Sequence, residues 1–240
     1  MHWFEDWFDS KYYHILYKNR DQQEAENFLT NLNHLEYFKN RSNIIDVGCG
    51  KGRHALLLSR IGHNVTGIDL SESSISSAKR HESKNLKFEI ADMRKYIRIN
   101  SFDIALSLFT SFGYFEDKED DRKVIKVLNK NLKKNGILII DFLNSKKVIS
   151  NLVNSEIRII DEIKFEIKRQ FDRGFIKKNI NIYDNKKHYF FQERVRALTK
   201  KDFKKMLDIV GMKIIDIFGD YNLNEFDESN SDRLIIIAKK

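Results

Sequence analysis

The chain has 240 residues, with 43 lysines and arginines against 35 aspartates and glutamates, giving a net charge of +8. This length suffices for a sizeable core in one large or two small domains. The positive charge is scattered in short pairs such as Lys200-Lys201, which indicates solvated faces rather than a nucleic-acid surface. The single cysteine, Cys49, excludes an intrachain disulfide and a cysteine-based metal cluster.

The start of the chain shows no basic segment leading into an apolar one, the mark of a secretory signal. Apolar runs stay well below the ~20 residues that a membrane-spanning helix needs. We therefore expect a cytoplasmic protein without a membrane partner.

Residues 1–20 are dense in aromatic side chains, several of them four positions apart, which predicts helices with aromatic stripes. Such helices could pack on the core or could form a lid over a bound ligand, and the sequence leaves both alternatives open. Asp21 followed by Glu24 predicts the start of another helix, which runs to about Leu35. The aromatic residues are Trp3, Phe4, Trp7, Phe8, Tyr12, Tyr13 and Tyr17.

Three glycines at alternate positions follow the apolar run Ile44–Val47, which we interpret as a buried parallel strand. They are Gly48, Gly50 and Gly52, and an amphipathic helix is predicted over Arg53–Arg60. A strand, a glycine loop and a helix in this order place backbone N–H groups at the carboxyl edge of a sheet. The alternative is a tight turn that binds nothing.

The spacing argues against a dinucleotide. The fingerprint G-x-G-x-x-G that starts at Gly48 would need glycine at position 53, where the chain has Arg53. Instead the pattern is D-x-G-x-G-x-G, with Asp46 ahead of the first glycine. A carboxylate at that position suits an ammonium group better than a pyrophosphate.

Further strands are predicted at 63–69, 86–90, 102–108 and 136–141, with helices at 71–82 and 117–134 between them. Asp69 ends the second strand, where Rossmann-like sheets keep a ribose-binding acid, and Asp92 follows the third. Asp141 and Asn144 could supply half of a metal site, but the segment Leu108–Tyr114 offers no acid. We therefore predict no metal.

Residues 155–198 alternate between apolar and polar side chains, with turn signals at Arg173-Gly174 and Asp184-Asn185. This predicts an antiparallel meander, and its apolar face could cover the cleft at the carboxyl edge of the main sheet or could form a dimer interface. A helix over 199–210, stopped by Gly211, and an antiparallel strand pair at 212–218 and 233–238 complete the chain.

The motif at Asp46–Gly52, together with Asp69 and Asp92, resembles the class I S-adenosylmethionine (SAM)-dependent methyltransferases of the small-molecule type. The resemblance covers roughly residues 43–141 by motif and the last 40 residues by strand pattern. It implies an α/β fold: a Rossmann-like doubly wound seven-stranded mostly parallel sheet with the last strand antiparallel, plus an inserted antiparallel β-meander. The implied domains are a helical lid at 1–40, a SAM-binding domain at 41–154 and 199–240, and an inserted β lid at 155–198.

The resemblance also implies a cofactor site for SAM. Asp46 helps to hold the amino end of the methionine moiety, Asp69 the ribose and Asp92 the adenine amine, while Arg20 could meet the methionine carboxylate. The full set expected to bind the cofactor is Tyr17, Arg20, Asp46, Gly48, Cys49, Gly50, Gly52, Asp69, Leu70, Asp92, Met93, Leu108 and Phe109.

The expected function is methyl transfer to a small-molecule amine or hydroxyl by in-line displacement. A hydroxyl would need a base, for which Tyr114, His188, Glu193 and Tyr221 are candidates; Tyr114 and His188 are the expected catalytic residues. Two alternatives stay open: an RNA or protein methyltransferase, which the positive charge permits, and a SAM-binding protein without catalysis. A homodimer is also compatible with the sequence.

Overall fold

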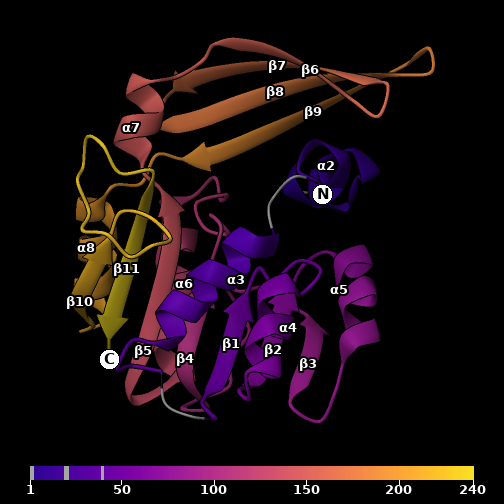
Figure 1. Ribbon diagram of the computed structural model, residues 1–240. Coiled ribbons are helices and arrows are strands. Elements are labelled where there is room, and N and C mark those ends of the chain that lie inside the picture. The colour runs from indigo at the N-terminus through magenta and orange to yellow at the C-terminus, as the bar shows by residue number, and fades with distance from the viewer. Residues whose placement is uncertain (1–2, 19–21, 39–40) are drawn as a thin grey trace.

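A seven-stranded sheet forms the centre of the computed structural model, which describes residues 3–18, 22–38 and 41–240 (Figure 1). Its strand order is β10-β11-β5-β4-β1-β2-β3. Strands β1 to β5 run parallel, and β11 is antiparallel to both of its neighbours. This confirms the predicted fold class. The strands are β1 (Asn43–Val47), β2 (Asn64–Asp69), β3 (Leu86–Ile90), β4 (Phe102–Ser107), β5 (Leu132–Leu143), β10 (Lys213–Phe218) and β11 (Arg233–Lys239).

Helices cover both faces of this sheet because each carries one apolar stripe. On one face, Phe28, Leu58 and Ile75 enter a common buried cluster; on the other, Leu128 and Phe203 do so. The helices are α3 (Gln22–Asn33), α4 (Arg53–Arg60), α5 (Glu72–Ala78) with the short 3-10 helix η1 (Lys79–His81), α6 (Lys118–Asn131), α7 (Ser145–Ser150) and α8 (Lys200–Ile209).

Two predicted boundaries were wrong. The helix expected through residue 134 ends at Asn131, whose side chain accepts from Arg98 N and donates to Tyr96 O, and β5 begins at the next residue. The helix expected through residue 82 changes to η1 after Ala78.

The predicted meander forms a separate antiparallel sheet in the order β6-β7-β8-β9. Its buried face presents Phe165, Ile167, Ile180 and Ile182. The strands are β6 (Ser155–Ile160), β7 (Ile163–Asp172), β8 (Phe175–Asp184) and β9 (Lys187–Arg196).

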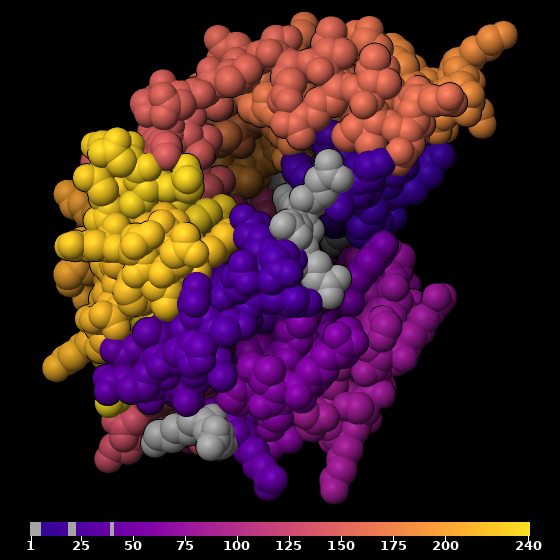
Figure 2. Space-filling model, in the orientation of Figure 1, coloured from indigo at the N-terminus to yellow at the C-terminus, as the bar shows by residue number. Residues whose placement is uncertain are grey.

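The apolar face of the small sheet packs on the N-terminal helices α1 (Trp3–Asp9) and α2 (Lys11–Leu16) through Trp7, Tyr12 and Leu16. These helices lie between the small sheet and the carboxyl ends of the parallel strands (Figure 1). In the space-filling view, the indigo N-terminal atoms separate the orange small sheet from the magenta body (Figure 2). The expectation that the meander itself faces the cleft was therefore wrong, because two helices intervene.

Candidate active site

The glycine loop connects β1 to α4 and is held by backbone bonds. The N–H groups of Gly48 and Cys49 both donate to the carbonyl of Ile68, at 2.8 and 3.1 Å. Gly48 has φ +72°, and a Cβ on it would lie 2.6 Å from Cβ of Ser111. Gly50 also has positive φ, but a Cβ there would meet open space. The loop is thus packed from behind at Gly48, and its backbone is accessible to a ligand at Gly50.

Asp69 ties the end of β2 to this loop. One carboxylate oxygen accepts from the N–H of Gly50 at 2.8 Å, and the other accepts from that of Ser71 at 2.9 Å. Burial raises the pKa of Asp69, while these backbone bonds act in the opposite direction. A carboxylate has about four lone-pair sites, so it can still accept from the hydroxyls of a diol.

Asp46 lies on β1 beneath the loop and is 1% exposed. Its Oδ2 has no hydrogen-bond partner within the described part of the chain. Burial raises the pKa of Asp46 to about 7, and the charge of Asp69 adds to this effect. A buried, unpartnered carboxylate oxygen is costly, and an ammonium group at the loop would offset that cost. This orphaned oxygen and the open backbone at Gly50 fit the amino-acid end of SAM.

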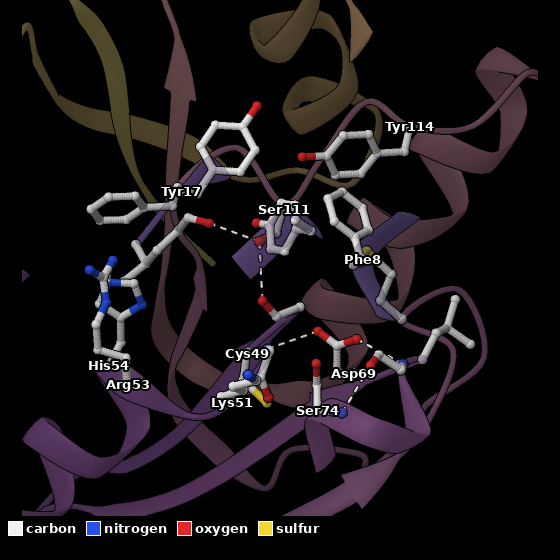
Figure 3. A pocket seen from close by; sticks show the side chains of 18 of the residues that line it. Phe8, Tyr17, Cys49, Lys51, Arg53, His54, Asp69, Ser74, Ser111 and Tyr114 are labelled. Carbon is white, nitrogen blue, oxygen red and sulfur yellow. Dashed lines mark hydrogen bonds between the residues drawn. The ribbon is translucent and has the colours of Figure 1, made fainter. Parts of the chain in front are cut away.

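A cavity of about 390 Å³ opens above the loop, a volume within the range of small-molecule sites. Its floor includes Gly48–Lys51 and Asp69–Ser71, and its roof comes from α1, α2 and the loop after β4 (Figure 3). Hydrogen bonds from Ser71 and Ser73 to Asp9 join the roof to the floor. The expected residues that line the cavity are Tyr17, Gly48, Cys49, Gly50, Asp69, Leu70, Met93, Leu108, Phe109 and Tyr114.

Two further residues expected to bind the cofactor, Gly52 and Asp46, lie outside the cavity lining. Gly52 caps the start of α4 behind the loop, with φ +80°. Asp46 does not itself line the cavity. Arg20 lies outside the described residues.

Asp92 does not line the cavity, and its predicted adenine contact stays a prediction. Its two carboxylate oxygens accept from Nε of Arg94, each at 3.0 Å, and Arg94 also binds Asp120 at 2.7 Å. Burial would raise the pKa of Asp92, but the bonds from Arg94 lower it overall. Asp92 is thus paired with Arg94, while its chain neighbours Ala91 and Met93 line the cavity.

The expected catalytic role of His188 does not fit its position. His188 is exposed on β9 opposite Tyr183, and its Nε2 lies 2.9 Å from Oδ1 of Asn181. The histidine is on the outer part of the small sheet, with the N-terminal helices between that sheet and the cavity.

Glu193 and Tyr221 are structural partners of cavity residues. Glu193 accepts from Nε1 of Trp7 at 2.8 Å and from the hydroxyl of Tyr17 at 2.6 Å. Tyr221 stacks on Phe109 at 5.2 Å and donates to Asp141 at 3.1 Å. Burial raises the pKa of Tyr221, and the charge of Asp141 adds to this effect, so Tyr221 is a poor base.

Asp141 holds the loop after β4. It is fully buried and accepts from Nε of Arg233 at 2.7 Å and from the N–H of Phe109 at 2.8 Å. Phe109 and Thr110 both have positive φ, at 53° and 62°, a conformation that costs energy for such residues. Within the described ranges, no group of three or more histidine, cysteine or acidic side chains could hold a metal ion.

Sequence reasoning missed part of the cavity lining. His54 is buried, and burial together with the charge of Arg53 lowers its pKa to about 3, so its imidazole is neutral at physiological pH. Arg53 lies over the ring of Phe109, 4.6 Å from its centroid. The sequence pattern did not indicate that His54 and Arg53 line a cavity, because their position there depends on the loop after β4. The lining residues outside the expected cofactor and catalytic sets are Phe8, Tyr13, His14, Lys18, Lys51, Arg53, His54, Ser71, Ser74, Ala91, Ser111 and Phe115; of these, Phe8 and Tyr13 belong to the aromatic segment for which a lid was one alternative.

The fold and this cavity define an α/β protein that binds a nucleoside-bearing ligand at the carboxyl edge of its sheet. A family model described as "Methyltransferase domain" matches residues 38–211. The chain therefore belongs to the class I SAM-dependent methyltransferases, which confirms the resemblance, the enzyme class and the cofactor SAM. When bound, SAM supplies an electrophilic methyl group on a sulfonium.

Known proteins resemble the chain over most of its length. YqeM of Bacillus subtilis is 28% identical over 83% of this chain and 85% of its own. The structure of a SAM-dependent methyltransferase from Clostridium acetobutylicum matches with a TM-score of 0.80 at 21% identity, covering 95% of both chains. SAM-bound CalS10, an amino pentose methyltransferase from Micromonospora echinaspora, matches with a TM-score of 0.72 at 14% identity, covering 96% of this chain and 97% of its own. None of the described helices has the length and apolar character needed to span a membrane.

Proposed function

We propose that this methyltransferase acts on a small-molecule acceptor. The observation that carries the proposal is the roof: α1 and α2 lie across the carboxyl edge of the parallel strands and enclose the cavity. The space of about 390 Å³ must hold the cofactor and the reacting part of the acceptor together. An acceptor group on a folded RNA or protein would have to pass beneath these helices.

In this proposal the helices α1 and α2 form the lid, and the small sheet packs on them and holds them in place. The helices α1 and α2 and residues 155–198 thus act together over a SAM-binding domain formed by 41–154 and 199–240, on whose sheet α3 packs through Phe28. The fold shared with an amino pentose methyltransferase supports an acceptor of that size class. We expect no nucleic-acid partner.

Tyr114 is the residue proposed to contact the acceptor. It lines the cavity, and its hydroxyl points into the space opposite the glycine loop (Figure 3). Its neighbour Phe8 lies 5.4 Å away between ring centroids. Tyr114 therefore stands where an acceptor would lie between the lid and the cofactor.

The test is a transfer assay with SAM labelled in the methyl group and three acceptor fractions: small molecules, total RNA and total protein. Label should enter the small-molecule fraction. Gly48→Val is the inactive control, because a side chain at Gly48 meets Ser111. Label in RNA or protein alone would contradict the proposal, and SAM binding without transfer to any fraction would favour a non-catalytic role.

A further inference from the structure

Aromatic rings form a continuous wall on the lid side of the cavity. Phe8, Tyr13 and Tyr114 all line it, and they are called the aromatic wall below. Phe8 lies 5.0 Å from Tyr13 and 5.4 Å from Tyr114 between ring centroids, both nearly edge-to-face. The wall continues to Tyr17, 5.1 Å from Tyr13. Such rings present negative faces and can attract cations.

The wall is held in place from behind. Tyr17 donates to Glu193 and accepts from Lys178, and Lys178 lies over the Tyr17 ring at 4.5 Å. Trp7 packs edge-on against Tyr13 at 5.6 Å. These contacts fix the rings before any ligand enters, which reduces the entropy lost on binding.

Fixed positive charge gathers on the other side of the cavity. Lys51 belongs to the glycine loop, and Arg53 begins α4; Figure 3 shows both away from Phe8 and Tyr114. Lys18, which follows Tyr17 on the lid side, also lines the cavity, but it is paired with Asp161 at 2.6 Å. Burial lowers the pKa of His14, and nearby Lys51 lowers it further. The cationic side suits a carboxylate, whereas the aromatic wall suits a positive group.

We propose, building on the small-molecule function above, that the acceptor is an amine and that the aromatic wall binds its methylated, cationic form. An amine that has received a methyl group is an ammonium ion, and methylated ammonium groups are favoured ligands of clustered aromatic rings. The wall itself contributes no carboxylate that could serve as a base for a hydroxyl. Asp69, a carboxylate on the floor, is held by the N–H groups of Gly50 and Ser71.

The test compares two ligands of nearly equal shape, choline and 3,3-dimethyl-1-butanol, of which only choline is charged. Calorimetry on the protein saturated with S-adenosylhomocysteine should show that choline binds tighter by about 5–30-fold, the range of a desolvated cation–π contact. Tyr114→Leu should remove most of this preference, and Tyr114→Phe should retain it. Tyr183→Leu, on the exposed outer part of the small sheet, is the matched control and should change nothing.

Equal affinity for the two ligands, or no choline binding at all, would overturn the inference. A preference that survives Tyr114→Leu would do the same. Retained S-adenosylhomocysteine binding shows that the variant is folded; if it is lost, Phe8→Leu replaces it with the same expectation. Methyl label on the oxygen of a small molecule would overturn the amine class while leaving the small-molecule function intact, whereas label in RNA or protein alone would remove that function first.

Discussion

The floor and the roof of the cavity are built in different ways. On the floor, backbone N–H groups and the carboxylate of Asp69 set the geometry, through bonds such as Gly50 N to Asp69 at 2.8 Å, and Asp46 is buried beneath the loop. The roof consists of side chains on two short helices, held by a second sheet through contacts such as Trp7 to Glu193 at 2.8 Å. The floor joins the ends of two successive strands, 19 residues apart at Gly50 and Asp69, while the roof joins segments that lie 186 residues apart at Trp7 and Glu193. Changes to the roof should therefore cost stability, and changes to the floor should cost cofactor affinity.

The largest effect is expected from a substitution that disrupts the packing of the roof. Trp7 is fully buried between the lid and the small sheet, so Trp7→Ala should lower the free energy of unfolding by about 3–5 kcal/mol. Urea denaturation measures this change. Phe190→Ala, on a side chain that is 56% exposed, is the control and should stay within about 0.5 kcal/mol of the parent protein. An unchanged midpoint for Trp7→Ala would mean that the lid is not anchored as described.

A change to the floor should act on affinity instead. Asp69→Ala removes the acceptor of the Gly50 N–H together with the carboxylate for the ribose. A hydrogen bond to a charged group is worth ~1.5–3 kcal/mol, so SAM should bind roughly 10–150-fold more weakly. Calorimetry should show a similar loss for 5′-methylthioadenosine, which keeps the ribose but lacks the amino acid. Asp172→Ala, at the end of β7 in the small sheet, is the control, and equal dissociation constants for both variants would remove Asp69 from the site.

The raised pKa of Asp46 predicts a pH dependence that further tests the contrast between floor and roof. Its pKa of about 7 in the folded protein compares with about 4 in an unfolded chain. Between these values the folded state binds a proton that the unfolded state lacks. This group therefore makes the ligand-free protein less stable as pH rises, by at most ~1.4 kcal/mol per pH unit, and the loss is complete above the folded pKa.

An ammonium group beside Asp46 would expel that proton. The contribution of Asp46 to SAM binding should therefore strengthen up to about tenfold per pH unit from about pH 5 to about pH 7. In calorimetry, 5′-methylthioadenosine should lack this contribution, and Asp46→Asn should abolish it for SAM. Identical pH profiles for the parent protein and Asp46→Asn would show that the carboxylate does not meet the amino group.

The smallest expected effect lies outside both floor and roof. His188→Ala removes an exposed side chain whose recorded hydrogen bond runs to Asn181, so kcat/KM should stay within about twofold of the parent value. A loss of a hundredfold or more in kcat/KM, measured with the acceptor found in the transfer assay, would show that His188 takes part in the reaction.

The contrast also explains how far the sequence could predict this protein. The positions of the parallel strands, the glycine loop and Asp69 follow from local spacing, since a parallel strand and a tight turn impose their own residue types. The pairing of Asp92 with Arg94 could not be predicted, because a pattern of acids does not show which arginine binds one of them. The position of α1 and α2 between the two sheets was also unpredictable. The alternating pattern of the small sheet shows that one face is covered, but it does not show that Trp7, Tyr12 and Leu16 cover it.

Cys49 has a chemical consequence for an enzyme that handles an alkylating agent. The chain's one cysteine lines the cavity floor, and its thiol donates to the carbonyl of Gly50 at 3.6 Å. Burial raises the pKa of Cys49 well above its usual range, and the charges of Asp46 and Asp69 add to this effect. The thiolate is the reactive nucleophile, so a thiol kept protonated reacts poorly. Burial of the thiol, together with the nearby charges of Asp46 and Asp69, thereby also disfavours methylation of the protein's own sulfur.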